Sequence, residues 1–153
     1  MRETNPVARI TQAPLFLLFR VGDAAREAVE QALDRYDLRG KDFRVLAYAA
    51  TGTHSQQDLA RSTGLDRTTM VAVVDRLERT GMATRERGAD RRRHVVVPTA
   101  QGLRTLTEAF ADLERTQADF LAALSPATQQ AMDTALTQLF TAHDPSCRPR
   151  PDA

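Results

Sequence analysis

The chain has 153 residues, 42% of them hydrophobic, and a formal net charge of +1, which predicts one compact folded unit and excludes general disorder. It has no run of eighteen apolar residues and no secretion-signal pattern, so neither a membrane partner nor export is expected. A single cysteine, Cys147, cannot form an internal disulfide, which favours a cytoplasmic location. Residues 37–99 carry twelve Lys and Arg against eight Asp and Glu, a net charge of +4, and the rest of the chain carries −3. The basic middle predicts an anionic partner.

The first half of the chain predicts helices. Apolar residues recur at three- and four-residue steps from Pro14 to Tyr36, as in a long amphipathic helix. A second helix is expected over residues 43–50, with Asp42 as its N-cap and Gly52 after its end. Two shorter helices are expected next, one from Ser55 to Gly64 and one from Asp66 to Gly81, each opened by a capping side chain and closed by a glycine.

The pattern changes after Gly81. Residues 83–87 and 94–98 are rich in Val, Thr and Arg and flank the turn Gly88–Asp90, which predicts a β-hairpin. Helices are then expected over residues 99–124, capped by Thr99, and over residues 125–142, opened by Ser125-Pro126. The proline-containing residues 144–153 are expected to be a disordered tail.

This order of elements predicts a mainly α fold with a small β-hairpin wing, in the α+β class. Residues 37–99 form a winged helix-turn-helix for DNA binding. Residues 1–36 and 100–143 supply long helices whose apolar faces exceed what the middle unit covers, so they are expected to form a homodimer.

The helix after Asp66 is the expected recognition helix. Its buried stripe is Met70, Val73, Val74 and Leu77, which leaves a face near the N-terminus formed by Arg67, Thr68, Thr69, Val71 and Ala72. In a helix-turn-helix this face meets base edges in the major groove, where arginine binds guanine and an apolar side chain contacts a thymine methyl group. The alternatives are an ordinary surface helix and a module that binds protein. Ser55, Gln56 and Gln57 are candidates for the DNA backbone, although Ser55 also suits simple helix capping.

The stretch from Leu46 to Gly102 resembles the MarR family of bacterial transcription regulators. The blocks that carry the resemblance are SQQDLA, GLDRTTM, VDRLERTGM, DRR and TAQG. The resemblance implies a homodimeric regulator, most commonly a repressor, that binds double-stranded DNA at a palindromic operator with its recognition helices in successive major grooves. Many family members have polar residues where this chain has Val71 and Ala72.

The resemblance also implies roles for the basic wing. Asp90 is expected to orient Arg92, which enters the minor groove, with Arg91 beside it. For Arg85 and Arg87 a phosphate contact and simple solvation both stay open. Arg76 is expected to bind phosphate or the wing, or to form a surface salt bridge with a neighbouring acid.

A small aromatic or phenolic ligand is implied by family members that release DNA when such an anion enters the crevice beside the dimerisation helices. Phe16, Arg20 and Phe43 are the candidate pocket residues, with core packing as the alternative. The sequence has no nucleotide-binding glycine loop, metal-ligand cluster or nucleophile motif, so no enzyme activity, metal or cofactor is expected. A winged-helix adaptor that binds protein instead of DNA stays the alternative function.

Overall fold

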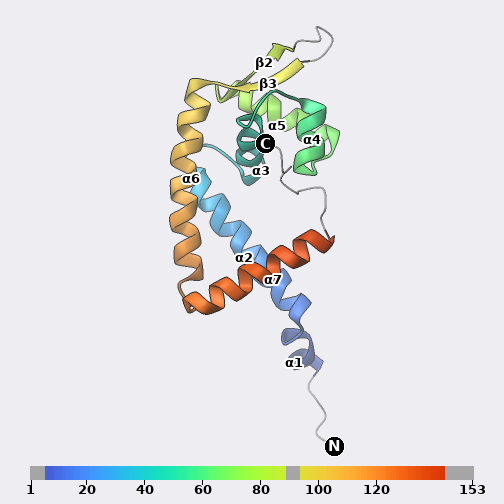
Figure 1. Ribbon diagram of the computed structural model, residues 1–153, viewed down its shortest axis with the longest axis vertical. Coiled ribbons are helices and arrows are strands. Elements are labelled where there is room, and N and C mark those ends of the chain that lie inside the picture. The colour runs from blue at the N-terminus through green and yellow to red at the C-terminus, as the bar shows by residue number, and fades with distance from the viewer. Residues whose placement is uncertain (1–5, 89–93, 144–153) are drawn as a thin grey trace, which may run out of the picture.

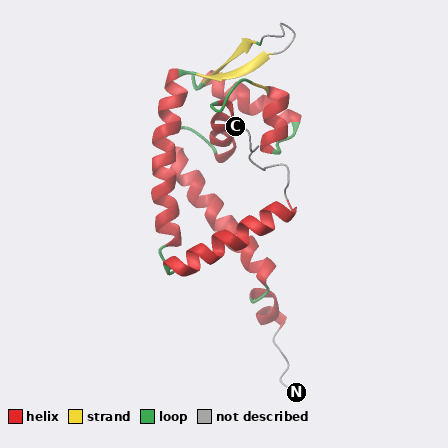
Figure 2. Cartoon of the chain, viewed as in Figure 1, coloured by secondary structure: helices red, strands yellow, loops and turns green. Residues whose placement is uncertain are grey.

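The computed structural model describes residues 6–88 and 94–143 (Figure 1). Helices dominate the chain, and one small antiparallel sheet lies at one end of the molecule (Figure 2). In chain order the elements are α1 (Pro6–Thr11), α2 (Pro14–Asp34), α3 (Gly40–Ala49), β1 (His54–Ser55), α4 (Gln56–Thr63), α5 (Arg67–Arg79), β2 (Ala83–Arg87), β3 (His94–Pro98), α6 (Ala100–Leu121) and α7 (Pro126–His143). This is the mainly α winged-helix fold expected from the sequence.

The core lies in the winged unit, where α3, α4 and α5 pack together and β3 lies against α3 and α4. The end of α2 and the first half of α6 complete it. Fully buried apolar side chains come from all of these elements, and they include Leu33, Leu46, Leu59, Met70, Leu77, Val96 and Ala109. Since burial of apolar area is the main stabilising contribution, the unit that carries α5 is also the most firmly folded part.

The sheet has the order β1-β3-β2, and both pairings are antiparallel. The predicted hairpin is confirmed, with Ala83 opposite Pro98 and Arg87 opposite His94. The sequence did not predict β1, whose two residues pair with Val95 and Val96. This pairing attaches the start of α4 to the returning strand of the wing.

Four predicted helix caps are confirmed, and one of them is Ser125, whose hydroxyl accepts a hydrogen bond from the N–H of Thr128 at 3.3 Å. The hydroxyl of Ser55 accepts a hydrogen bond from the N–H of Asp58 at 3.2 Å, and the carboxylate of Asp58 accepts one from the N–H of Ser55 at 3.1 Å. Asp66 accepts from the N–H of Thr69 at 2.9 Å, and Thr99 accepts from the N–H of Gly102 at 3.0 Å. Each cap satisfies an N–H group that has no partner within its helix.

Asp42 was expected to cap the second helix, and that prediction is wrong. The helix begins three residues earlier, with Arg39 at the N-cap, and Asp42 lies within its first turn. The Asp42 carboxylate accepts a hydrogen bond from the N–H of Arg39 at 3.1 Å. It is also fully buried, and the guanidinium groups of Arg39 and Arg76 compensate its charge there. Two further differences concern helix ends: α2 stops at Asp34, and the short helix α1 was not expected.

The long helices carry a large uncovered apolar surface. α2 packs along α6, while α1 and the start of α2 project away from the winged unit (Figure 1). Among the described residues α7 has none that is buried. The exposed apolar side chains include Val7, Ile10, Leu15, Leu17, Leu18 and Phe19 on α1 and α2, and Leu136, Leu139 and Phe140 on α7.

Candidate nucleic-acid interface

Helix α5 has the two faces expected of a recognition helix. Met70, Val73, Val74 and Leu77 are buried, as the spacing predicted. Of the five residues expected on the opposite face, Arg67, Thr68, Val71 and Ala72 are exposed. The hydroxyl of Thr69, by contrast, donates to the carboxylate of Asp66 at 2.6 Å. This hydrogen bond and the one from the N–H of Thr69 lower the pKa of Asp66. Thr69 therefore belongs to the helix cap.

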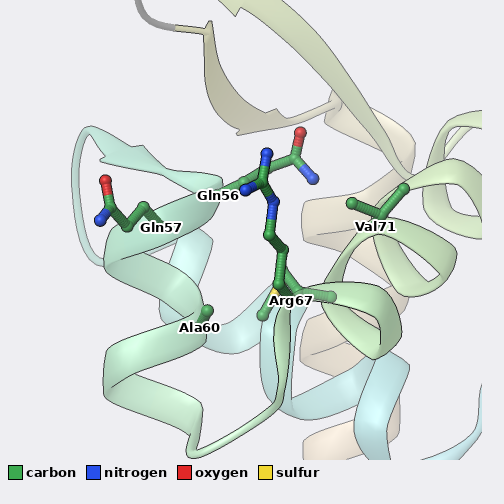
Figure 3. Close-up of a pocket in the computed structure, with 6 residues that line it drawn as sticks. Gln56, Gln57, Ala60, Arg67 and Val71 are labelled. Atoms are coloured by element: carbon green, nitrogen blue, oxygen red, sulfur yellow. The ribbon is translucent and has the colours of Figure 1, made fainter.

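Two hollows flank the exposed face of α5. The first, of about 450 Å³, lies between α4 and α5, and its lining residues are Gln56, Gln57, Ala60, Arg67, Met70 and Val71. Figure 3 shows the side chain of Arg67 rising between the two helices, beside Gln56 and opposite Val71. The second, of about 380 Å³, is lined by Arg67, Thr68, Val71, Ala72 and Asp75. Arg67 and Val71 line both, so they stand at the centre of the surface.

The start of α4 borders the first hollow. Ser55 is half-buried, and its hydroxyl donates to Asp58 at 2.6 Å in addition to its capping bond. These hydrogen bonds from Ser55, with a smaller contribution from Arg61, lower the pKa of Asp58 to about 2. The hydroxyl of Ser55 thus caps α4, which is one of the two roles expected from the sequence. Its contact with the DNA backbone stays a prediction. Gln57 is exposed, whereas the side-chain oxygen of Gln56 accepts a hydrogen bond from Arg85.

Arg85 joins three elements of this surface. From β2 its Nε donates to Oε1 of Gln56 on α4 at 3.0 Å, one Nη lies 2.5 Å from Oδ1 of Asp75 on α5, and the other contacts Glu78. Its backbone N–H also donates to Glu78, at 2.8 Å. The sequence left a phosphate contact and simple solvation open. The intramolecular partners of Arg85 differ from simple solvation, and a phosphate contact stays a prediction. The guanidinium is 23% exposed and surrounded by acids, so it links the wing to the recognition helix.

Arg76 forms ion pairs with two acids of the winged unit. Its guanidinium lies 3.1 Å from buried Asp42 and 2.5 Å from Asp37, which precedes α3, and it donates to the Asp37 carbonyl at 2.9 Å. Asp42 additionally binds Arg39 and raises the pKa of that guanidinium. Of the alternatives that the sequence left open, the structure shows an ion pair with acids, while a contact of Arg76 with phosphate or the wing stays a prediction. Its donors face acids that lie 34 and 39 residues away in the chain, and no local sequence signal marks such a pairing.

Known proteins share this arrangement. The MarR family model matches residues 36–94. The uncharacterised HTH-type transcriptional regulator YcgE of Bacillus subtilis (strain 168) is 33% identical over 94 residues, which are 61% of this chain and 60% of that relative, so the match spans less than two thirds of its length. A transcriptional regulator (MarR family) from Rhodococcus sp. RHA1 has a TM-score of 0.73 at 28% identity over 84% of this chain and 95% of its own. The winged unit of the chain thus matches the MarR family model, and the similarity of fold to a MarR-family regulator extends over most of the chain.

A second structure, CouR from Rhodococcus jostii RHA1, was solved with p-coumaroyl-CoA bound. It has a TM-score of 0.72 at 26% identity, over 85% of this chain and 93% of its own. The fold that surrounds the winged helix is therefore shared along nearly the whole length of these MarR-family structures. This includes the long helices, which lie mostly outside the residues matched by the family model.

The MarR-type wing is only partly described. Arg87 ends β2 and is exposed. Asp90, Arg91 and Arg92 lie outside the described residues, so the expected orientation of Arg92 by Asp90 stays a prediction.

The three candidate ligand-pocket residues have different surroundings. Phe43 packs edge-to-face on Phe110 of α6, with ring centroids 4.8 Å apart. Phe16 is half-buried and Arg20 is exposed. The expected ligand pocket formed by these three residues stays a prediction.

The remaining chemistry is sparse. Within residues 6–88 and 94–143 no group of three or more His, Cys, Asp and Glu side chains could hold a metal ion. In the same ranges no helix has the length and apolar character needed to cross a membrane. The similar proteins described above are named as transcriptional regulators.

Proposed function

We propose that the chain is a sequence-specific DNA-binding transcriptional regulator that acts as a homodimer on a palindromic operator. The observation that carries the proposal is the exposed face of α5, where Arg67, Thr68, Val71 and Ala72 lie beside the start of α4 and the base of the wing. A helix-turn-helix meets the major groove with this part of its second helix. The match of residues 36–94 to the MarR family model supports the same role.

Dimerisation is proposed because α7 and the start of α2 have apolar faces without a cover. Leu15 is 80% exposed and Phe19 67% exposed. Apolar patches of this kind usually mark an interface, and a two-fold pair would place two recognition helices on one duplex. Two α5 helices related by such an axis read the same sequence on opposite strands, which is the reason for a palindromic site.

The finer parts of the proposal are repression and release by a small ligand. Repression is the more common mode in the family. CouR was crystallised with an aromatic CoA thioester, and on this basis we propose that a small aromatic molecule enters between the long helices and the winged unit. Phe16, Arg20 and Phe43 are its proposed contacts, with Phe43 already fixed against Phe110.

The decisive experiment measures binding to the duplex upstream of the protein's own gene against a scrambled duplex of equal composition. Fluorescence anisotropy over a series of salt concentrations should give a preference for the upstream duplex. The affinity should fall steeply, with a slope of about −0.9 per neutralised phosphate. Light scattering should give twice the mass of the chain, and Leu139→Glu on α7 should lower that mass. A monomer that binds both duplexes equally would refute the proposal and favour a protein-binding adaptor.

A matched pair of variants tests the wing. Arg92→Ala should weaken binding strongly, because the resemblance to the MarR family assigns the minor-groove contact to this arginine. Arg93→Ala, which removes the same charge one residue further on, should have a smaller effect. Equal losses would contradict the assignment to Arg92.

A further inference from the structure

The exposed face of α5 changes character along its length. Arg67 in the first turn is cationic, Val71 and Ala72 in the second are apolar, and Asp75 in the third is acidic but paired with Arg85. Val71 is 42% exposed, in a helix whose other valines are fully buried. A single exposed valine does not by itself indicate a partner. Because this face is the one proposed to meet DNA, burial of Val71 against the duplex is favourable only where it meets an apolar group of a base.

The polar groups around Val71 do not compete with it for a base. Asp75 is held by Arg85, the side-chain oxygen of Gln56 also accepts from Arg85, and Thr69 is bound to Asp66. Within the described part of the chain, Arg67 makes no hydrogen bond or ion pair, so its donors are free for a ligand. The free groups at the centre of this face are thus one guanidinium and one apolar patch.

DNA offers one partner for each. In the major groove the C5-methyl of thymine is the apolar group, and the O6 and N7 atoms of guanine accept two hydrogen bonds from arginine. Arg67 and Val71 are four residues apart, so they are separated by about 6 Å along the helix axis. Successive bases of a strand are about 3.4 Å apart, so this separation covers one or two base steps.

We propose that Val71, with Ala72 beside it, selects a thymine through its methyl group, and that Arg67 selects a guanine one or two base steps away. Each half-site of the operator therefore contains a thymine that contacts Val71 and, one or two base steps away, a guanine that contacts Arg67. The inference rests on the proposed function, since it specifies the bases that the recognition helix reads. It depends on the two residues of α5 that line both hollows.

The test uses the upstream duplex with single-atom-group changes. Each thymine of the two operator half-sites is replaced in turn by deoxyuridine, which lacks only the methyl group. Each guanine is replaced in turn by 7-deazaguanine, which lacks N7. For the wild type, one thymine per half-site should show a loss of about fourfold on replacement, the contribution of one buried methyl-sized group. A guanine one or two steps away should show a loss of about tenfold.

Variants of α5 assign the bases to the residues. In Val71→Ala the deoxyuridine effect should disappear while the 7-deazaguanine effect persists, and in Arg67→Ala the reverse should hold. Arg79→Ala, which removes an exposed arginine from the last turn of the same helix, is the charge-matched control and should keep both effects. Circular dichroism melting confirms that each variant is folded.

The outcomes separate this inference from the proposed function. Specific binding that tolerates deoxyuridine at every thymine, or a deoxyuridine effect of equal size in Val71→Ala, overturns the inference and leaves the regulator proposal standing. A wild type that binds no duplex better than the scrambled one overturns both.

Discussion

Replacing Arg85 with alanine removes the side chain that joins β2, α4 and α5. The variant loses the hydrogen bond to Gln56 and the ion pairs with Asp75 and Glu78, and it leaves those two acids without their cation. Exposed ion pairs contribute about 0–1 kcal/mol each and hydrogen bonds to charged groups up to about 3 kcal/mol. With Arg85 only 23% exposed, we expect the free energy of unfolding to fall by about 1–2 kcal/mol, a drop in melting temperature of about 2–8 °C.

DNA binding should weaken by about tenfold, because the wing base and the recognition helix lose their fixed relation. The salt dependence separates this role from a phosphate contact. A phosphate contact from each chain of a dimer would reduce the slope by about 1.8, whereas a residue that only positions others leaves the slope unchanged. Binding is measured by anisotropy between low and moderate salt.

Two controls complete the test. The double variant Arg85→Ala, Asp75→Ala restores the net charge and should keep the wild-type slope with reduced affinity. Arg87→Ala removes an exposed arginine two residues further along the same strand, and it should lower the slope if the wing contacts phosphate. If Arg85→Ala and the double variant both reduce the slope by about 1.8, Arg85 binds DNA directly and the reasoning from its intramolecular partners is refuted.

Four further substitutions test the fold. Asp42→Ala removes a fully buried carboxylate that binds two arginines, so urea unfolding should show a loss of about 2–3 kcal/mol, and a loss below 0.5 kcal/mol would count against that network. The pKa of Asp58 is about 2, below the ordinary 3.8, so its contribution to stability is complete above about pH 4 and disappears as the pH falls toward 2. Melting temperatures of the wild type and Asp58→Asn should therefore converge over that range, and a constant difference would contradict the capping role. A Cβ at Gly102 would overlap the carbonyl oxygen of Met82, whereas one at Gly22 meets nothing within 4 Å. Thermal melting should show that Gly102→Ala costs about 1–3 kcal/mol and that Gly22→Ala is neutral or stabilising by up to 1 kcal/mol; equal effects would be inconsistent with this packing.

The sequence predicted best where the physical cause is local. Ser55, Asp66 and Thr99 cap their helices as expected, because a cap joins groups only three residues apart. The buried stripe of α5 was also predicted, since helical periodicity alone determines which side chains share a face. The hairpin followed from its short β-branched strands and the turn between them.

The structure differs from the sequence-based expectations where the contacts of a residue come from distant segments of the chain. Asp42 has the chemistry of an N-cap, but Arg76 reaches it from 34 residues away and makes burial of the carboxylate favourable. Arg85 sits in a basic run that suggests a polyanion, yet its acids lie on the helix before the wing. The two-residue strand β1 is too short to show any periodicity, and its pairing with β3 is a tertiary contact.

One residue, Thr99, separates the end of β3 from the start of α6. Thr99 is held on both sides: its hydroxyl donates to the carbonyl of Gly81 at 2.6 Å, and its N–H donates to the carbonyl of Met82 at 3.0 Å. The connection between the wing and α6 is therefore fixed by hydrogen bonds. Helix α6, with 22 residues, is about 33 Å long. A tilt of about 5° at this connection displaces the distant end of the helix by about 3 Å. In the proposed dimer, the same geometry relates a displacement at the distant end of α6 to a tilt at Thr99. A small change in packing there would therefore change the angle at which the wing meets DNA.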